Sequence, residues 1–471
     1  MSDELCFMPA TELVQRIRSG ELSARELMQA SLAQIERLNP KLNAIVSLYA
    51  EQALAQALAA DERQVRREVL PILHGLPVAH KDLALTRGMR TTFGSPIFKD
   101  FIPEQNQLMV DRLQAAGAVS VGKTNTPEFG AGSQTFNAVF GKTLNPYDTS
   151  KTCGGSSGGS AVALAAGMVP LADGSDMGGS LRCPANFCNV VGMRTSPGRV
   201  PVWPAKSGWS TLRVEGPMAR TVADCALMLS VMAGPDARSP IAIAEPGAAF
   251  AGTLARDFRG VRIAWSTDLG GLPVDARVSS VLASQRSTFA ALGCVLEDAT
   301  PDLADANAIF HTLRAWQFEL SLGELLDRHR DLLKDTVIWN IEAGRKLDGP
   351  QIGAAESKRT ALYNRMHEFM RRYEFLILPV NQVPPFDVEQ PYITEINGKT
   401  MDTYIDWMKS CYFITVTGHP AISVPCGFTP QGLPVGVQIV GRHQDDFGVL
   451  QLAHAFEQAT QLWKRRPPIA I

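Results

Sequence analysis

Short apolar runs separated by helical stretches constrain the fold of this chain more than any other feature. Each run is bounded by turn-forming or polar residues and is too short to be an independent helix, which is typical of buried strands. Strands that alternate with helices predict an α/β layered structure. The runs are Leu76–Val78, Ala118–Val121, Arg262–Trp265, Phe375–Leu378, Ala421–Val424 and Val435–Val440.

The remaining sequence suggests how the chain is organised around these strands. Residues 1–70 are predicted to be helical, and Ser23 with Glu26 has the spacing of a capping box at a helix start. No tandem repeat or low-complexity tract divides the chain. The least regular part, roughly 123–220, is rich in Gly, Ser, Thr and Pro, and a long loop region inside a compact protein usually carries function.

Charge and cysteine usage exclude several classes of function. The 45 Lys and Arg residues nearly balance the 47 Asp and Glu residues, so no global field attracts nucleic acid or an anionic membrane, and a small-molecule substrate is expected. The acidic start, MSDELCF, predicts a cytoplasmic protein without a secretory signal. The eight cysteines form no CxxC pair and no HExxH is present, so we expect reduced thiols, no metal site and no cofactor.

Two motifs imitate other enzyme classes. Gly117–Thr124 satisfies the GxxxxGK[ST] spacing of a phosphate-binding loop, but Ala118–Val121 is predicted to be a strand and Pro127 disrupts a helix start. The stretch from Ser120 to Lys123 fits the SxxK pattern of penicillin-binding enzymes, yet no KTG or SDN motif supports it. Nucleotide binding is therefore kept only as a distant alternative.

The Gly- and Ser-rich run Gly154–Ser160 is a stronger candidate. A flexible linker would be polar on both sides, whereas this run opens an apolar, small-residue segment and is predicted to contact the core. It also fits the GxSxG nucleophile elbow around Ser156. An elbow needs an apolar strand upstream, where this chain is turn-rich, and His419 and His443 are only nominal partners.

A second run, Gly174–Pro184, places two glycines before Ser180. Glycines leave backbone N–H groups unobstructed, which suits the binding of a developing oxyanion, although a structural turn is an equal interpretation. A serine nucleophile needs a base, and Lys81 at the end of a predicted strand is the candidate. The alternative for Lys81 is an ion pair with Asp82 at the surface.

Taken together, these segments resemble the amidase signature family. The Lys81-Asp82 strand, the GGSSGG loop at Gly154–Gly159 and the Gly174–Pro184 segment occur in the family's order, with a Ser156–Ser180 spacing of 24 residues. Further agreement extends to Gly122–Gly130, Gly192–Arg199 and Gly432–Gly441.

The resemblance implies an α/β fold, a large mixed twisted β-sheet covered by helices on both sides. It also implies one domain over residues 1–471, with a helical N-terminal segment of about 1–70 and a variable, lid-like segment of about 240–370.

In that family a lysine and two serines are catalytic, and they correspond here to Lys81, Ser156 and Ser180. The resemblance also implies a cis peptide bond between Gly155 and Ser156. The predicted oxyanion donors are the backbone N–H groups of Met177, Gly178 and Gly179, with that of Ser180 as a further option. The predicted site-supporting residues are Ser157, Asp176 and Arg182.

A lysine can act as a base only when it is neutral. A free lysine has a pKa near ~10.4, so about one in a thousand is neutral at pH 7.4, a handicap of roughly 4 kcal/mol. We therefore predict that Lys81 is buried, because desolvation lowers the pKa of an amine, and that no carboxylate holds it charged.

The predicted function is cleavage of the C–N bond of a small amide-like substrate, which leaves aryl or alkyl amides, carbamates and ureides open. The alternatives are the glutaminase-type catalytic subunit of a tRNA-dependent amidotransferase, a nucleotide-binding protein and an inactive scaffold. A homodimer is left open. Aromatic residues of segments 300–350 and 385–415 are candidates for the substrate pocket or for the ordinary core: Trp316, Phe318, Trp339, Tyr392, Tyr404, Trp407 and Tyr412.

Overall fold

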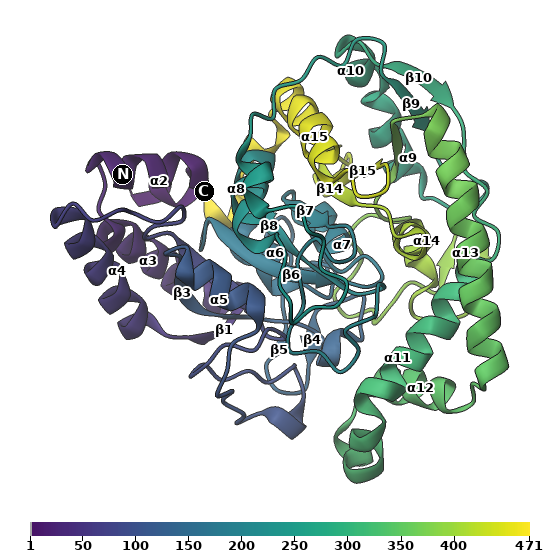
Figure 1. The fold of residues 1–471 in the computed structure, drawn as a ribbon, viewed down its shortest axis with the longest axis horizontal. Helices are drawn as coiled ribbons and strands as arrows, with labels where there is room; N and C mark the ends of the chain where they lie inside the picture. Colours follow the sequence, from purple (N-terminus) through teal and green to yellow (C-terminus); the bar gives the residue numbers. More distant parts are fainter. Residues whose placement is uncertain (1) are drawn as a thin grey trace.

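A mixed sheet of 11 strands runs through the computed structural model, which describes residues 2–471 (Figure 1). Parallel pairs such as β2 with β6 alternate with antiparallel pairs such as β6 with β8. From edge to edge the strands are β1 (Ile45–Leu48), β3 (Val119–Thr124), β2 (Pro77–Lys81), β6 (Leu171–Asp176), β8 (Val214–Ala219), β7 (Val191–Arg194), β14 (Ala421–Phe428), β15 (Pro434–Gly441), β11 (Phe375–Pro379), β9 (Arg262–Trp265) and β10 (Val295–Asp298).

Helices cover both faces of this sheet. Successive side chains of a strand point to opposite faces, and the two large core clusters divide accordingly: Leu376 belongs to one and Ile377 to the other. The first cluster includes residues of α1 (Ser2–Phe7), α3 (Ala24–Leu42), α4 (Ala50–Val65), α6 (Gly158–Ala165), α7 (Arg182–Phe187), α11 (Ala306–His329), α13 (Gly349–Arg372) and α14 (Lys409–Thr417). The second includes residues of α2 (Ala10–Ser19), α5 (Leu108–Ala115), α8 (Val222–Met232), α9 (Ala276–Ser284), α10 (Arg286–Ala291) and α15 (Asp446–Thr460).

The predicted fold class is confirmed, and all six apolar runs overlap strands of the sheet, two of them starting one residue before the strand. The capping box is also present, because Ser23 Oγ accepts from the N–H of Glu26 at 3.0 Å and the Glu26 carboxylate accepts from the N–H of Ser23 at 2.9 Å. The short apolar runs in the sequence therefore located most of the hydrophobic strands.

Two parts of the prediction are wrong. The N-terminal 70 residues are not all helical, because Ile45–Leu48 forms the edge strand β1 between α3 and α4. The region 123–220 is not a loop region, since β6, β7 and β8 cross it and are buried along their whole length. Its small and polar residues are buried because neighbouring strands satisfy their backbone groups and helices cover both faces.

The segment 240–370 supplies β9, β10, α11 and nearly all of α13, which are the two longest helices of the described chain. Helices α11 and α12 (Asp335–Arg345) pack against each other, and α13 runs beside them along the edge of the molecule (Figure 1). The single domain over 1–471 and the lid-like role of this segment stay predictions.

No helix of the described chain combines the length and apolar character needed to cross a membrane. The eight cysteines are all buried, and no disulfide bond joins any of the residues that the structure describes.

The strand arrangement brings two chain segments together at one edge of the sheet. Strands β2 and β6 are parallel neighbours, so their carboxyl ends, at Lys81 and Asp176, lie at the same edge. In open α/β sheets this edge is where ligands bind.

The close pairing of β1 with β3 depends on Gly122, and Gly122→Ala is expected to destabilise the protein. A Cβ at this position would lie 2.0 Å from the carbonyl oxygen of Ser47, so the two strands must separate. We expect a loss of about 2 kcal/mol or more in the free energy of unfolding, measured by urea denaturation. Gly353→Ala on α13 is the control, because no heavy atom lies within 4 Å of its Cβ position and alanine favours a helix by about 1 kcal/mol. Equal stability of the two variants would contradict this account of the strand pair.

Candidate active site

Lys81 ends β2 inside the protein, with 1% of its surface exposed. Within the described part of the chain its side-chain nitrogen forms hydrogen bonds only with hydroxyl groups, at 2.7 Å to Ser156 Oγ, 2.9 Å to Ser157 Oγ and 3.2 Å to Ser175 Oγ. Asp82 turns elsewhere and accepts from the N–H and hydroxyl of Thr92. The prediction that Lys81 is buried and not paired with a carboxylate is confirmed, and the surface ion pair is wrong.

The surroundings of Lys81 favour its neutral form. Burial, together with the positive charge of Arg213, lowers the pKa of its amine from 10.5 to about 7, against the opposing charges of Glu215, Asp176 and Asp173. An amine with a pKa near 7 is about half neutral at neutral pH. Lys81 therefore has the lone pair that a general base requires.

The three hydroxyl contacts match the bonding capacity of a neutral amine, which has two N–H donors and one lone pair. The Ser157 hydroxyl donates to the carbonyl oxygen of Ser175 at 3.5 Å, so towards Lys81 it can only accept. Ser156 makes the shortest contact and is positioned to give its proton to the amine. The arrangement can thus carry a proton from Ser156 to Lys81.

Ser156 and Ser157 lie immediately before α6. The peptide bond between Gly155 and Ser156 is cis, as the resemblance implied. The whole run Gly154–Ser160 is buried rather than exposed, so the linker interpretation is wrong. Gly159 allows the start of α6 to pack against the loop after β3, since a Cβ there would lie 2.3 Å from the backbone nitrogen of Asn125.

Ser180 lies in the loop between β6 and α7 and lines the same cavity as Ser156 and Ser175. It is half-buried, and its hydroxyl forms no hydrogen bond with any residue that the structure describes. Its carbonyl oxygen accepts from the N–H of Ser157 at 3.1 Å, which ties the two serine loops together. The Ser180 hydroxyl is therefore accessible from the cavity.

The backbone donors beside Ser180 differ from one another. The N–H of Gly179 donates to Asp176 Oδ1 at 2.9 Å, so it is already committed within the protein. Those of Met177, Gly178 and Ser180 donate to no residue in the described part of the chain. The oxyanion role stays a prediction, and it is better supported for Met177 and Gly178 than for Gly179.

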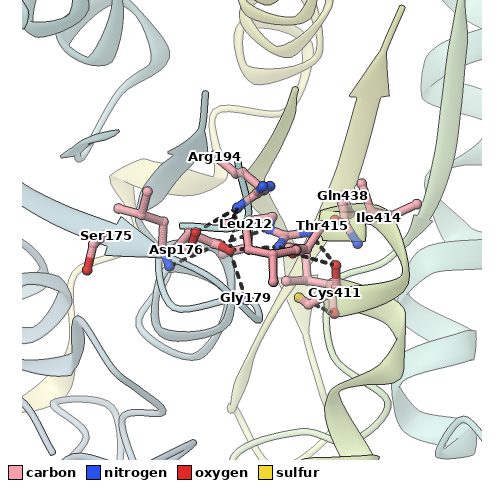
Figure 2. A network of polar contacts seen from close by, with 12 residues as sticks. Ser175, Asp176, Gly179, Arg194, Leu212, Cys411, Ile414, Thr415 and Gln438 are labelled. Atoms are coloured by element: carbon pink, nitrogen blue, oxygen red, sulfur yellow. Dashed lines mark hydrogen bonds and ion pairs between the residues drawn. The ribbon is translucent and has the colours of Figure 1, made fainter. Parts of the chain in front are cut away.

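A buried ionic network holds the loop that carries Ser180 (Figure 2). Arg182 binds both carboxylate oxygens of Asp176, at 2.9 and 3.0 Å, and Arg194 donates to the carbonyl oxygen of Asp176 at 2.6 Å. Burial alone would raise the pKa of Asp176, but the charges of the two arginines hold it well below its usual range. Arg182 also donates to Cys411, Thr415 and Gln438, so α14 and β15 anchor the same loop.

A cavity of about 560 Å³ opens over the three serines. Much of its wall is apolar, and α11 contributes Phe310, Arg314, Gln317, Ser321 and Glu324, which recur at helical spacing and so form one stripe of that helix. Of the seven aromatic candidates, Phe318 and Tyr404 line this cavity and the other five do not. The large apolar side chains that line the cavity include Leu83, Leu85, Phe93, Phe98, Phe129, Met177, Val200, Phe310, Phe318, Ile405 and Met408.

The rejected motifs have structural explanations. Lys123 is buried in β3, where it donates to the carbonyl oxygen of Ala84 and to Thr86 Oγ1, so it is not the lysine of a phosphate-binding loop. Ser120 bonds His80 instead of the lysine three residues later, and His419 bonds Thr417. Among residues 2–471, no three His, Cys, Asp or Glu side chains form a group that could hold a metal ion.

Sequence reasoning missed two residues of the site, Ser175 and Arg213. Ser175 belongs to the Gly174–Pro184 segment, but its orientation towards Lys81 depends on β6 being a strand, which was not predicted. Arg213 precedes β8 in the region interpreted as a loop, and no local signal marked it.

Comparison with known proteins identifies the family. A family model described as Amidase matches residues 26–450. This chain belongs to the amidase signature family. It is therefore a hydrolase that acts on C–N bonds.

Individual relatives align with nearly the whole of this chain. An acylamidase of Rhodococcus erythropolis is 36% identical over 468 residues, 98% of each chain. A glutamyl-tRNA(Gln) amidotransferase subunit of Methylococcus capsulatus is 34% identical over 489 residues, again 98% of each chain. The solved structure of a bacterial aryl acylamidase of the family aligns with a TM-score of 0.92 and 29% identity, covering 98% of both chains. The two kinds of relative are similarly distant, so the family alone does not define the substrate.

The low pKa of Lys81 should be visible in protein stability. Below pH 7 this lysine is protonated in both folded and unfolded states, and the folded state bears the full cost of a buried charge. As pH rises from about 7 towards 10.5, the folded state loses its proton first and the cost disappears. The stability of the wild type relative to Lys81→Met should therefore increase over this window by on the order of a few kcal/mol, measured by urea unfolding at pH 6.5, 8 and 9.5. A difference that does not vary with pH would mean that Lys81 titrates normally.

Proposed function

We propose that this protein is a serine amidohydrolase that cleaves small aryl or alkyl amides through an acyl-enzyme on Ser180. The observation that carries the proposal is the buried amine of Lys81, which contacts three serine hydroxyls and no carboxylate. Such an amine has the lone pair and the proton path that activation of a serine requires.

In this mechanism Ser180 Oγ attacks the carbonyl carbon of the amide. Ser156 takes the proton of Ser180 and passes its own to Lys81, while the N–H groups of Met177 and Gly178 stabilise the negative oxygen. The proton then returns through Ser156 to the leaving nitrogen, and the C–N bond breaks to give an ester on Ser180. Water, activated by the same pair, hydrolyses the ester and regenerates the enzyme.

The wall of the cavity supports amides with apolar or aromatic groups. Phenylalanine, leucine and methionine side chains surround the serines, and such walls favour apolar substrates by removing their surface from water. The acylamidase and aryl acylamidase among the relatives agree with this preference. Carbamates and ureides present the same carbonyl and C–N bond and belong to the wider substrate set.

A second candidate is the glutaminase-type catalytic component of a tRNA-dependent amidotransferase, favoured by the 34% identity to one component of such an enzyme. Glutamine carries an ammonium group that needs a carboxylate partner. Glu324 is the only carboxylate among the described residues that line the cavity, where apolar side chains predominate. The cavity therefore supports a stand-alone amidase better. Glutamine hydrolysis that exceeds anilide hydrolysis, or that requires added partner proteins, would favour the second candidate.

Loss of Ser180 should abolish the reaction. Ser180→Ala is expected to lower kcat for p-nitroanilide hydrolysis by ~10⁴-fold or more and to prevent labelling by a fluorophosphonate serine probe, because no acyl-enzyme forms. Ser156→Ala and Lys81→Ala should slow acylation by a similar order. Ser284→Ala, on an exposed position of α9, is the control with unchanged rate, and thermal unfolding verifies that all variants fold. A rate in Ser180→Ala equal to that of the wild type would end the proposal.

The rate should depend on the protonation of Lys81. Only the neutral amine accepts a proton, and the pKa of Lys81 is lowered to about 7. We expect kcat/KM for a neutral anilide to rise with pH, to reach half its maximum near pH 7 and to level off above about pH 8. The measurement is a pH–rate profile between pH 5.5 and 9.5. A profile that stays flat down to pH 5.5 would show that the base is not this lysine.

A further inference from the structure

The cavity carries an excess of positive charge. Among the described residues that line it, Lys206, Arg213 and Arg314 are positive and Glu324 is the only carboxylate, while Glu215, the ion-pair partner of Arg213, lies outside the lining. In a cavity with apolar walls, charges of one sign act over longer distances than in water and concentrate ligands of the opposite sign. The proposed neutral amide chemistry does not require this imbalance, so the charges point to a feature of the substrate.

Arg213 lies next to the reacting groups. It directly precedes β8, whose first residue, Val214, pairs with Asp176 at the end of β6. The backbone register therefore places Arg213 beside Met177, where the Ser180 loop begins. Its charge is felt by Lys81, which independently indicates that the guanidinium is close to the site.

The guanidinium of Arg213 is fixed on one side and available on the other. Nη2 donates to Glu215 Oε1 at 2.8 Å, and the buried Glu215 is itself held by Gln107 Nε2 at 3.1 Å. The remaining nitrogens of Arg213 donate to no residue in the described part of the chain, and 42% of the side chain is exposed. An arginine with free donors in a fixed plane suits a carboxylate, which it can bind through two parallel hydrogen bonds.

Arg314 adds a second positive charge, and unlike Arg213 it has no ion-pair partner among residues 2–471. Arg314 is 6% exposed, and it donates to the neutral side chains of Asn340 and Tyr404. Its guanidinium carbon, Cζ, lies 4.6 Å from the centroid of the Phe318 ring. No carboxylate within residues 2–471 forms an ion pair with it, although a buried charge without one is costly. A bound anion in the cavity would reduce that cost.

We propose that Arg213 binds a carboxylate of the substrate, and that the preferred substrates are amides carrying a carboxylate within a few bonds of the scissile C–N bond. The inference rests on the proposed amidase function and narrows its substrate class. Arg314 supports the same preference by adding positive charge to the cavity. The apolar walls contact the rest of the substrate.

Two matched substrate pairs test this assignment, one for each side of the scissile bond. On the acyl side, the 4-nitroanilide of succinic acid is compared with that of pentanoic acid, which is of similar length and neutral. On the amine side, 4-acetamidobenzoate is compared with 4-methylacetanilide. For wild-type enzyme we expect kcat/KM to be about 10- to 100-fold higher for the anionic member of at least one pair, the range expected of hydrogen bonds to a charged group.

Variants of Arg213 identify the residue responsible. Arg213→Gln should remove the preference, chiefly through KM of the anionic substrate, and Arg213→Lys should retain part of it. The control is Arg262→Gln, an arginine of similar exposure, 45%, that forms an ion pair with Glu297 far from the cavity residues. Thermal unfolding of each variant verifies folding, and the wild-type comparison stands even where a variant does not fold.

The outcomes separate this inference from the proposed function. Equal kcat/KM within both pairs, with neutral anilides hydrolysed, would overturn the carboxylate assignment and leave the amidase function intact. An equal loss for both members in Arg213→Gln, with the acid limb of the pH profile moved to higher pH, would also overturn it, because Arg213 would then act only on Lys81. If no anilide is hydrolysed, both the proposed function and this inference fall.

Discussion

The burial of one amine organises the active site. Lys81 ends a strand that is covered on both sides, and among residues 2–471 its side-chain nitrogen forms hydrogen bonds only with hydroxyls. A carboxylate at the same position would keep the lysine charged and remove the lone pair that a base requires. The rest of the site therefore has to provide oxygen atoms without negative charge, and serines on separate stretches of chain meet this requirement.

The carboxylates of Asp176 and Asp173 bind groups other than the Lys81 side chain. Asp176 is enclosed by Arg182 and Arg194, and Asp173 accepts from His80 and from the backbone of Lys81. Breaking such a buried pair is far more costly than never having formed it, because the remaining charge has no partner. The Asp176 pairs thus stabilise the loop that carries Ser180, and neither carboxylate binds the Lys81 side-chain nitrogen.

The burial of Lys81 and most hydrophobic strands could be predicted from the sequence, whereas the polar strands could not. Strands such as Phe375–Pro379 can be recognised in the sequence because both of their faces are apolar. The strand Leu171–Asp176 contains two aspartates, a glycine and a serine, and its burial depends on partners that are distant in sequence. For the same reason Ser175 and Arg213 went unnoticed, and the commitment of the Gly179 N–H to Asp176 emerges only from the folded loop. Local sequence pattern predicts the strands that are apolar by themselves. The polar strands and the site residues on them depend on contacts between segments that are distant in sequence.

The cavity wall and the reacting groups come from different parts of the architecture. Lys81 ends β2, Ser156 lies immediately before α6 and Ser180 lies in the loop between β6 and α7, whereas Phe310 and Arg314 belong to the stripe of α11, more than a hundred residues later. Exchanges along that stripe alter what fits above the serines without disturbing the strands below. Divergence of such a lineage toward new compounds can therefore proceed on a helix surface, with the inherited chemistry untouched.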